Sequence, residues 1–515
     1  MKRRNFVKNL TLSSVAAPFL LNNMKFQAVS KKLFGVPKIA EDRVLVLIRM
    51  NGGNDGLNTL IPLDGYDNLS NLRTNIIIPQ SEILSLTPNV GLHPVMTGMR
   101  DMFNAGNLGV IQNVGYPQQN RSHFRSMDIW STGMMEPSET TGWIGRPFDS
   151  EFPNFPVDYP NNDNPDPFAI SMGYNVSATC QGLMGNFSHA VVDPFDAVNL
   201  GQGSVPNDGT YYGDHMEYIS TMIAQSNAYG LEVNDAANAG NTMSTLYDDN
   251  NPLAVQLRFV AQMISGGLKT KVFILNINGF DTHDSQVDTI SNSNGNHAFL
   301  LKTMSDGIAA FQDDLNLLGL SNRVAGMTYS EFGRQIASNA STGTDHGDAA
   351  PLFLFGSCLS NGIMGPNPLI PAQVTNQQGV DMQIDFRDVY ASVLKDWFVV
   401  DETEIESMFE HQVTFFPILG ACNVGLDEKE LSEDQLLLYP NPAINNTTLR
   451  IKTQNENITI SAIDLLGKKV QTLLETTVNE GEHNIPLDLS DLARGQYVVQ
   501  VLKSSGNGQV SLVKK

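Results

Sequence analysis

Cysteine, basic charge and long apolar segments are all scarce in this chain of 515 residues. The three cysteines lack the paired spacing of a disulfide framework or of a CxxC metal knuckle. The chain has 32 basic residues against 54 acidic ones, so it lacks the clustered Lys and Arg that bind a nucleic-acid backbone. These shortages argue against nucleic acid as a partner. Because the cysteines lack the spacing of a disulfide framework, we expect the stability of the fold to come from packing, with bound metal ions as a further candidate source.

No segment after residue 30 has the roughly eighteen uninterrupted apolar residues of a membrane helix, so we expect no transmembrane segment in the mature chain. The beginning of the chain differs, because it starts with Lys2, Arg3 and Arg4, continues with an apolar run and ends in small residues. This order predicts an export signal over residues 1–30. The pair Arg3-Arg4 looks like a twin-arginine signal, with a general secretory signal as the alternative.

Four continuous apolar runs stop abruptly in polar loops, as buried parallel strands do. Helical segments alternate with them; His297 to Leu318, for example, repeats apolar residues such as Phe299 and Phe311 at helical spacing. Strands that alternate with helices predict an α/β domain with a mostly parallel sheet. Such sheets bind ligands beyond the carboxyl ends of their strands, so the residues after each run are candidates for a site. The four runs are residues 43–48, 108–114, 271–277 and 323–329.

The composition changes twice along the chain. Between residues 149 and 208 it becomes rich in Pro, Asn, Asp and Gly, which predicts surface loops or a covering insertion. After residue 436, short alternating strands separated by turns predict a small β-sandwich. The predicted divisions are an export signal over residues 1–30, the α/β domain over 31–425, an acidic linker over 426–435 and the sandwich over 436–515.

The C-terminal region carries four short motifs: Leu438-Tyr-Pro-Asn-Pro442, Asp464-Leu-Leu-Gly-Lys468, Leu492-Ala-Arg-Gly-Gln-Tyr497 and Val513-Lys-Lys515. Together they resemble the type A C-terminal sorting domain of the type IX secretion system. The resemblance implies export across an outer membrane of the Bacteroidota type, to the cell surface or the extracellular space, with the secretion machinery as a partner. An ordinary carbohydrate-binding or adhesive sandwich is the alternative.

Carboxylates and imidazoles follow the four apolar runs. Oxygen and imidazole ligands suit divalent ions such as Zn or Mn, and two such ions close together stabilise the attacking and leaving oxygens of an ester displacement. Asp281 and His283 are two positions apart, so an extended segment points both to the same side. Each residue taken alone is also a common turn-former or cap. The candidates in these loops are Asp55, His123, Asp281, His283, Glu331, Asp345 and His346.

Asp345 and His346 are adjacent, so an extended strand would point them in opposite directions. They form a ligand pair only in an irregular loop, which the flanking Gly343 and Gly347 permit. We therefore expect this segment to be a loop that turns both side chains toward one site.

Five motifs occur in order along the α/β domain: Asn51–Thr59; Gly115–Pro117 with Asn120–Phe124 and Asp128–Gly133; Gly279–His283; Ser330–Arg334; and Gly343–Gly347. They resemble a family of exported bacterial proteins, a domain-of-unknown-function family grouped with the alkaline phosphatase and sulfatase superfamily. The resemblance covers about residues 43–397 and implies an alkaline-phosphatase-like fold, a mostly parallel sheet flanked by helices. It implies Asp55 as the first metal ligand, Asp281 and His283 as ligands of one ion, and Asp345 and His346 as ligands of the other.

The resemblance does not identify a single residue as the nucleophile. Ser122 is the first candidate, because it sits at a predicted helix start, where backbone N–H groups favour an oxyanion. The run Trp130-Ser-Thr-Gly133 resembles alkaline phosphatase, and alignment on this run would place the nucleophile at His123 instead. Thr59, in the first loop, is a third candidate.

Other site residues are implied in the same way. The superfamily has a further histidine ligand after the Asp-His pair, so either His297 or His411 replaces it here or one ion site is incomplete. Arg121 and Arg334 are candidates to clamp an anionic substrate, with ordinary ion pairs as the alternative. The chain has no Cys-x-Pro-x-Arg motif, which argues against a formylglycine sulfatase.

These features predict an exported metal-dependent hydrolase of phosphate or sulfate esters. Its substrates would be small-molecule or glycan-linked anionic esters, and its cofactors divalent ions such as Zn, Mn, Mg or Ca. The alternative is a non-catalytic surface protein that captures glycans or anionic ligands on a phosphatase-like scaffold.

Overall fold

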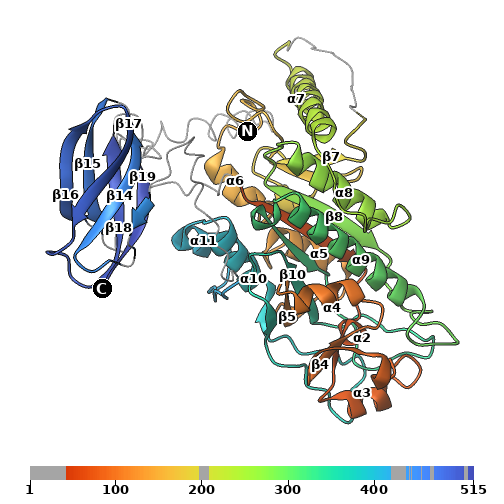
Figure 1. The fold of residues 1–515 in the computed structure, drawn as a ribbon. Coiled ribbons are helices and arrows are strands. Elements are labelled where there is room, and N and C mark those ends of the chain that lie inside the picture. Colours follow the sequence, from red (N-terminus) through yellow and green to blue (C-terminus); the bar gives the residue numbers. More distant parts are fainter. Residues whose placement is uncertain are drawn as a thin grey trace, which may run out of the picture. The chain divides into compact units, whose positions relative to one another are not determined.

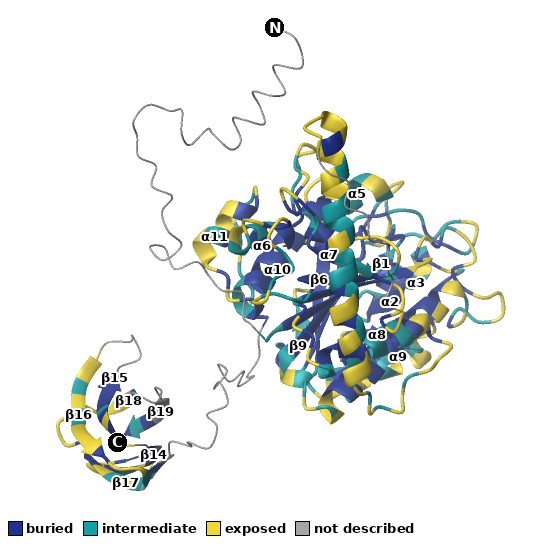
Figure 2. Ribbon diagram, turned by 90° about the horizontal axis from the view of Figure 1, so that it is seen from above, coloured by how far each residue is buried: buried dark blue, intermediate teal, exposed yellow. Residues whose placement is uncertain are grey.

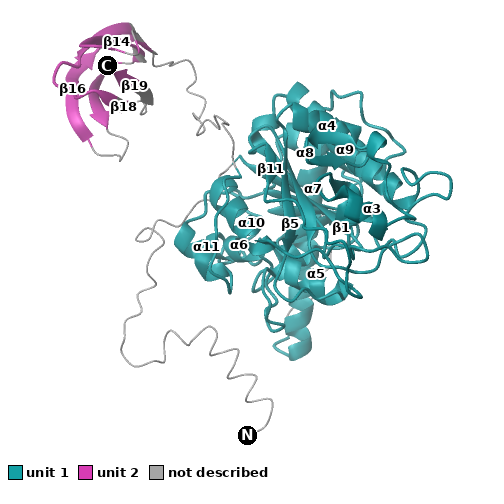
Figure 3. Ribbon diagram, turned by 90° about the horizontal axis from the view of Figure 1, so that it is seen from below, with its two compact units in different colours: residues 1–423 teal, residues 424–515 magenta. Residues whose placement is uncertain are grey.

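The structure, a computed structural model, divides the chain into two compact units, residues 1–423 and 424–515, coloured separately in Figure 3. The predicted export signal over residues 1–30 and the predicted linker over 426–435 lie outside the described residues. Among the residues that are described, no helix is both long and apolar enough to cross a membrane. The described residues are 42–196, 208–418, 437–439, 441, 443–453, 455–463, 469–503 and 508–515.

A nine-stranded sheet forms the centre of the larger unit (Figure 1), in the order β11-β5-β10-β9-β1-β8-β6-β7 with β12 paired to β5. Among its described strands, β10 alone runs antiparallel to its neighbours, so β1, β5, β8 and β9 end at the same edge. The predicted α/β fold with a mostly parallel sheet is confirmed. The strands are β1 (Val44–Asn51), β5 (Leu108–Gly115), β6 (Ala169–Met172), β7 (Ser188–Val191), β8 (Val272–Asn278), β9 (Val324–Tyr329), β10 (Ala350–Phe355), β11 (Gly362–Met364) and β12 (Ile384–Asp385), beside a small sheet of β2 (Leu60–Pro62), β3 (Leu84–Thr87) and β4 (Val90–Leu92).

Helices cover both faces of the central sheet. One core joins α4, α8 and α9 to alternate residues of β1. The opposite face carries an aromatic cluster, in which Trp130 of α5 stacks on Phe386 of α10 with 4.4 Å between ring centroids. The helices are α2 (Gly56–Thr59), α3 (Tyr66–Leu72), α4 (Thr97–Asn104), α5 (His123–Thr132), α6 (Gly145–Glu151), α7 (Tyr211–Ala239), α8 (Pro252–Ser265), α9 (Asn296–Leu317), α10 (Phe386–Ser392) with a π-helical turn (Val393–Trp397), and α11 (Glu402–Met408).

Strand β1 shows why a continuous apolar run occupies the middle of the sheet. Val44, Val46 and Ile48 belong to the core shared with α8 and α9. Leu45 and Leu47 alternate with them and are 0–1% exposed, so they are buried on the opposite face. Figure 2 shows the same burial as dark-blue strands between helices that expose their outer sides. A strand covered on both faces has no position for a solvated polar side chain, which accounts for the unbroken run.

Two expectations about the larger unit are wrong in detail. Residues 149–208 were expected to form surface loops or an insertion, but they supply β6 and β7, which extend the central sheet beyond β8. These strands have only four residues each, so their apolar pattern is too short to be distinctive. Phe299 was expected on the buried stripe of α9 but is 65% exposed, while the adjacent Leu300 is 8% exposed and faces the core.

The described cysteines differ in their chemical state. Cys180 is free and buried, and Cys358 is disulfide-bonded. The spacing of the cysteines did not predict a disulfide at Cys358.

The smaller unit consists of two antiparallel sheets, β13-β14-β17 and β16-β15-β18-β19, as the sequence predicts. Leu449 from one sheet and Ile460 and Val499 from the other are all 0% exposed and share one core. The strands are β13 (Leu437–Tyr439), β14 (Asn446–Thr453), β15 (Glu456–Ile463), β16 (Lys469–Val478), β17 (Gly481–Asp488), β18 (Gly495–Lys503) and β19 (Gly508–Lys514).

Candidate metal centre at the strand ends

The loops after β8 and β9 are joined to the Asp345-His346 segment by backbone hydrogen bonds. The N–H of Gln335 donates to the carbonyl of Asp345 at 2.9 Å, and the N–H of Thr344 donates to the carbonyl of Thr282 at 3.1 Å. The backbones of Arg334 and His346 also form an antiparallel bridge. Paired backbone therefore holds the side chains of this site, which limits how far they can move apart.

The two glycines that flank Asp345 and His346 provide space for these pairings. Neither has a positive φ. A Cβ at Gly343 would lie 2.3 Å from the carbonyl oxygen of His283, and a Cβ at Gly347 would lie 2.2 Å from the carbonyl carbon of Arg334. The loop is irregular, as expected. The two glycines are required because other backbone segments approach them closely, and not because they adopt a left-handed conformation.

Three imidazoles converge on the carboxylate of Asp281. The Nε2 atoms of His283 and His346 each lie 3.0 Å from Oδ1 of Asp281, and 2.9 Å from each other. Nε2 of His123 lies 3.4 Å from Oδ2 of the same carboxylate. The four side chains are 22–44% exposed, so a ligand from solvent can reach them. We call these four residues the Asp281 cluster.

The second ring nitrogen of each histidine faces an oxygen that only accepts hydrogen bonds. Each Nδ1 must therefore carry the hydrogen, and in a neutral ring each Nε2 then presents a lone pair toward Asp281. Hydrogen bonds of this kind, from Nδ1 to a carboxylate or a carbonyl, orient metal-bound histidines in proteins. The pairs are His283 with Oδ1 of Asp345 at 2.8 Å, His346 with the carbonyl of Arg121 at 2.8 Å, and His123 with Oε1 of Glu331 at 2.9 Å.

The charge states in the cluster favour binding of a cation. Burial lowers the pKa of His346, although its contact with Asp281 raises it, so the ring is neutral at physiological pH. Burial raises the pKa of Asp281, but the hydrogen bond from Arg334 and the charge of its guanidinium outweigh this and bring the pKa to about 2. A carboxylate and imidazole nitrogens that all present lone pairs repel one another unless a cation lies among them.

The donor set of the cluster fits a divalent metal ion. His123, Asp281 and His346 offer ligand atoms within 4.8 Å of one another, the only such group of His, Cys, Asp and Glu that the described residues contain. His283 adds a further Nε2 beside them. Imidazoles with one carboxylate suit zinc or manganese better than magnesium or calcium, which prefer oxygen ligands.

Glu331, at the end of β9, positions His123. Its carbonyl accepts hydrogen bonds from Ser126 and from the indole of Trp130, both in α5. Its carboxylate accepts the N–H of Gly52 at 2.8 Å and faces Nδ1 of His123. Glu331 is 2% exposed, so it holds the first residue of α5 against the ends of β1 and β9 from a buried position. Its place after a strand marked it as a candidate, but its partner His123 could be seen only in the fold.

The three candidate nucleophiles have different environments. Ser122 is the exposed N-cap residue of α5, and its side chain makes no capping hydrogen bond. His123 belongs to the Asp281 cluster. Thr59 is 0% exposed, and its hydroxyl lies 2.9 Å from Oδ1 of Asn54 and 2.8 Å from the carbonyl of Asp55.

Two carboxylates expected to bind metal are engaged by protein groups. Oδ1 and Oδ2 of Asp55 lie 2.9 and 2.7 Å from Nη1 of Arg73, and Oδ2 accepts Nε2 of Gln286 at 2.6 Å. Asp345 contacts His283 and accepts a hydrogen bond from Asn339 at 3.2 Å. Asp345 therefore orients a histidine of the cluster, whereas Asp55 forms a separate buried ion pair.

The two histidines considered as the missing ligand also have protein partners. Nε2 of His297 lies 3.0 Å from Oδ1 of Asn54, and burial lowers the pKa of His297 to about 4. Nε2 of His411 lies 2.8 Å from Oδ1 of Asp388. In the described part of the chain, neither ring is part of the group around Asp281.

Both arginines expected to clamp an anion are committed within the protein. Arg121 forms a two-point ion pair with Asp348, at 3.0 and 2.7 Å. Arg334 is 1% exposed and donates to Oδ1 of Asp281 at 2.7 Å and to the carbonyls of Gly53 and Thr344, also at 2.7 Å. Arg334 therefore stabilises the charge of Asp281 and fixes the loop after β1.

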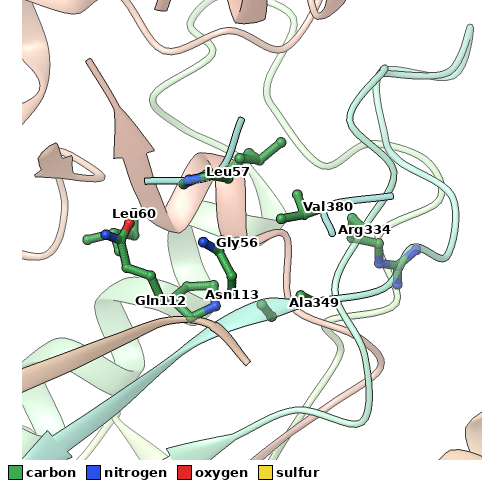
Figure 4. A pocket seen from close by; sticks show the side chains of 11 residues that line it. Gly56, Leu57, Leu60, Gln112, Asn113, Arg334, Ala349 and Val380 are labelled. Carbon is green, nitrogen blue, oxygen red and sulfur yellow. The ribbon is translucent and has the colours of Figure 1, made fainter. Parts of the chain in front are cut away.

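Two cavities near these residues differ in size. One, shown in Figure 4 with Gly56, Gln112 and Arg334 among its lining residues, has a volume of about 10 Å³. It has room for about one water molecule and cannot hold an ester. An open hollow of about 520 Å³ is lined by residues that include Arg121 and Asp381. Because the carbonyl of Arg121 contacts His346, this hollow adjoins the cluster.

The fold and the site define an α/β protein with histidine and aspartate gathered at its strand ends, and its structural neighbours are members of the alkaline phosphatase and sulfatase superfamily. A protein of the alkaline phosphatase superfamily from Vibrio parahaemolyticus is 10% identical, with 87% of this chain and 84% of that chain covered and a TM-score of 0.36. The PsFucS1 sulfatase from Pseudoalteromonas sp. is 8% identical, with 96% and 90% covered and a TM-score of 0.33. The phosphonate monoester hydrolase SpPMH from Silicibacter pomeroyi is 9% identical, with 92% and 89% covered and a TM-score of 0.30.

The sequence matches two family profiles. Residues 222–412 match the family described as "Protein of unknown function (DUF1501)", and residues 437–515 match the secretion system C-terminal sorting domain. The chain therefore contains a DUF1501 domain followed by a sorting domain, which supports export and a cell-surface or extracellular location. No curated protein matches the chain. Asp281, His283 and His346 lie inside the DUF1501 match, and His123 lies outside it.

Proposed function

We propose that this protein is an exported, metal-dependent hydrolase of phosphate or sulfate esters. The observation that carries the proposal is the convergence of three imidazole Nε2 atoms on the carboxylate of Asp281, each with its Nδ1 bonded to an acceptor. Such an arrangement is typical of a metal centre, because the outer hydrogen bonds fix the ring orientations before a metal ion arrives. The sorting domain supports the exported location.

His123, Asp281 and His346 would hold the ion, with His283 as a further ligand. A bound divalent ion would supply Lewis-acid stabilisation of an ester oxygen and would lower the pKa of a hydroxyl nucleophile. Arg334 keeps Asp281 ionised, and Asp345 and Glu331 keep His283 and His123 in the orientation that ligation requires.

Ser122 is the residue that we assign as nucleophile. It is exposed, its side chain is not used for capping, and it directly precedes His123 at the start of α5. The free N–H groups of the first helical turn and the positive end of the helix favour a negatively charged oxygen at this position. The same groups would attract the anionic part of an ester to Ser122.

The hollow of about 520 Å³ beside Arg121 is where we expect the remainder of the substrate to bind. It is open, so it can admit a small-molecule ester or the end of a larger ester-bearing chain. Phe124 is 87% exposed, two positions after Ser122, and offers an apolar surface next to the proposed nucleophile.

The test is hydrolysis of 4-nitrophenyl phosphate and 4-nitrophenyl sulfate by the full chain, before and after removal of metal with a chelator and after reloading with zinc or manganese. We expect turnover that disappears with the metal and returns on reloading. Ser122→Ala should lower kcat at least about 100-fold, as expected for loss of a nucleophile. His215→Ala, which changes an exposed histidine of α7, is the matched control and should leave turnover unchanged. A chain that neither binds metal nor hydrolyses either ester after loading would contradict the proposal.

A second candidate function is ligand capture without turnover. It is supported by a cavity of about 720 Å³ lined by residues of β7 and α7, within the usual size range of small-molecule sites. Tyr218, Tyr229 and Gln225 are among its lining residues, which include no member of the Asp281 cluster. Calorimetric binding of neutral oligosaccharides that persists in Asp281→Ala, together with no ester hydrolysis by the wild type, would favour capture.

A further inference from the structure

Arg73 lies inside a cage of oxygen atoms. Its side chain is 0% exposed, although it carries a permanent positive charge. Nη1 lies 2.7 and 2.9 Å from the two oxygens of Asp55 and 3.2 Å from Oδ1 of Asn58. The other two guanidinium nitrogens, Nε and Nη2, donate to the carbonyls of Ile336 and Gln335, each at 2.7 Å. Five oxygens thus surround one cation, with no nitrogen acceptor among them.

This cage lies at the strand ends, where metal was expected. Asp55 directly precedes α2 in the loop after β1, Gln286 reaches it from the loop after β8, and Gln335 and Ile336 follow β9. Carboxylate, amide and carbonyl oxygens are the ligands that hard divalent cations such as Ca²⁺ or Mn²⁺ accept. The chain has therefore assembled cation ligands at Asp55, and a side chain of its own occupies them.

The charge of Asp55 requires such a cation. The residue is 0% exposed, and a buried carboxylate without a positive partner is strongly unfavourable. Burial raises the pKa of Asp55, but Arg73 outweighs this effect and the net shift is downward. Arg73 is the cation that contacts this carboxylate, and all of its guanidinium nitrogens are engaged, so it has no group left to bind a substrate.

Polar side chains connect this cage to the Asp281 cluster. Gln286 donates to Asp55 and accepts a hydrogen bond from the hydroxyl of Thr344 at 2.8 Å. The carbonyl of Thr344 accepts Nη1 of Arg334, whose Nη2 bonds Asp281. Each of the two strand-end aspartates therefore has one fully buried arginine, but only Asp281 also faces imidazole lone pairs.

We propose that Arg73 is a built-in cation that takes the place of a second divalent metal ion at Asp55, so that the protein binds one ion, at the Asp281 cluster. The cage around Arg73 is then a latent metal site, which accepts a divalent ion once the guanidinium is removed. The first half of this inference rests on the proposed function, because it takes the Asp281 cluster as the place of the single ion. The second half depends only on the contacts of Arg73.

The experiment measures metal content of the full chain after equilibration with Mn²⁺ and removal of free ion, together with thermal unfolding with and without Mn²⁺. The wild type should hold one ion per chain, and Asp55→Asn should not lower that number. Arg73→Ala should hold one ion more than the wild type and should be stabilised by added Mn²⁺. The control Asp55→Ala/Arg73→Ala lacks the carboxylate, so it should return to the wild-type number and lose the response to ions.

The outcomes separate this inference from the proposed function. A wild type that holds two ions, one of them lost in Asp55→Asn, would overturn the inference, and so would a folded Arg73→Ala variant that gains no ion. If Arg73→Ala does not fold with or without ions, the comparison of the wild type with Asp55→Asn decides. A wild type without any ion or turnover would refute the proposed function, and a gain of one ion in Arg73→Ala would still support the latent site.

Discussion

Asp55 and Asp281 lie at the same edge of the sheet but in opposite environments. Asp55 is 0% exposed and bonded to the guanidinium of Arg73 and the amide of Gln286. Asp281 is 44% exposed and, besides Arg334, faces the Nε2 atoms of three histidines. Donor groups satisfy the first carboxylate completely. The carboxylate of Asp281 is surrounded by ring nitrogens that offer lone pairs, so this site favours binding of an additional cation.

Asp55 and Asp281 together show that a carboxylate after a parallel strand is not by itself a metal ligand. A carboxylate that is buried next to a fixed positive charge forms a structural ion pair. Removal of one partner of such a pair lowers the free energy of unfolding. An exposed carboxylate next to imidazole lone pairs is a candidate metal ligand, and its removal should affect metal binding more than folding. The following predictions test this contrast between function and stability.

The largest effect is expected for Asp281→Ala, which removes the carboxylate donor of the cluster. Metal binding should be lost, because the remaining imidazoles no longer carry a negative charge to balance the ion. Measurement of bound metal after dialysis would test this. The matched control is Asp284→Ala, an exposed aspartate three positions away, which should keep the wild-type metal content. Retention of the ion by Asp281→Ala would show that the cluster is not the metal centre.

Arg73→Met should have the next largest effect, on stability. It leaves Asp55 buried without a positive partner and should cost about 3–5 kcal/mol of unfolding free energy. Arg121→Met breaks the Arg121–Asp348 pair, in which both side chains are 28–29% exposed, and should cost about 1 kcal/mol or less. Urea unfolding of both variants in a metal-free buffer measures the difference. Equal losses would mean that burial does not distinguish the two ion pairs.

Asp345→Ala should weaken metal binding without unfolding the protein. The variant removes the acceptor of Nδ1 of His283, and loss of such an outer partner typically lowers metal affinity by about 10–100-fold. Asp345 is 49% exposed, so the unfolding free energy should change by about 1 kcal/mol or less. Competition with a fluorescent chelator would give the affinity. Unchanged affinity would indicate that the orientation of His283 does not contribute to the site.

The smallest effect is a pH dependence beside Asp55. Burial lowers the pKa of His297 to about 4, although Asp55 raises it, whereas an unfolded histidine has a pKa of about 6.5. The lowered pKa gives stability that is fully present above about pH 6.5 and is lost as the pH falls toward 4. Between pH 7 and 5.5 this histidine should account for about 1 kcal/mol of lost stability. Urea unfolding at both pH values should show a smaller loss in His297→Gln, and an identical loss would contradict the assignment.

The sequence predicted the strands well. It predicted less well which side chains contact the polar residues that follow those strands. The apolar run over residues 43–48 became β1 (Val44–Asn51), because the hydrophobic pattern of a strand buried on both faces is local information. The four-residue strands β6 and β7 were missed, because their place in the sheet depends on pairing with β8 and with each other. Local pattern predicts an element, but its neighbours in the sheet are set by packing.

The candidate site shows the same division. Asp281 and His283 were candidates because they follow a strand two positions apart, and the structure brings them together with His123 and His346. Asp55 was a candidate on equal grounds, but the structure gives it Arg73 as a partner. No local pattern marks Arg73, which lies at the end of α3, as the partner of Asp55.

By itself, the sequence determined the alternation of strands and helices, the C-terminal sorting domain and the set of polar residues that follow the strands, since each of these depends on residues close together in the chain. The folded arrangement alone shows that Arg73 neutralises Asp55, whereas Asp281 faces three imidazoles. The charge and reactivity of a carboxylate depend on its burial and on the donors around it. Those donors come from loops far apart in the sequence, which meet only when the sheet has formed.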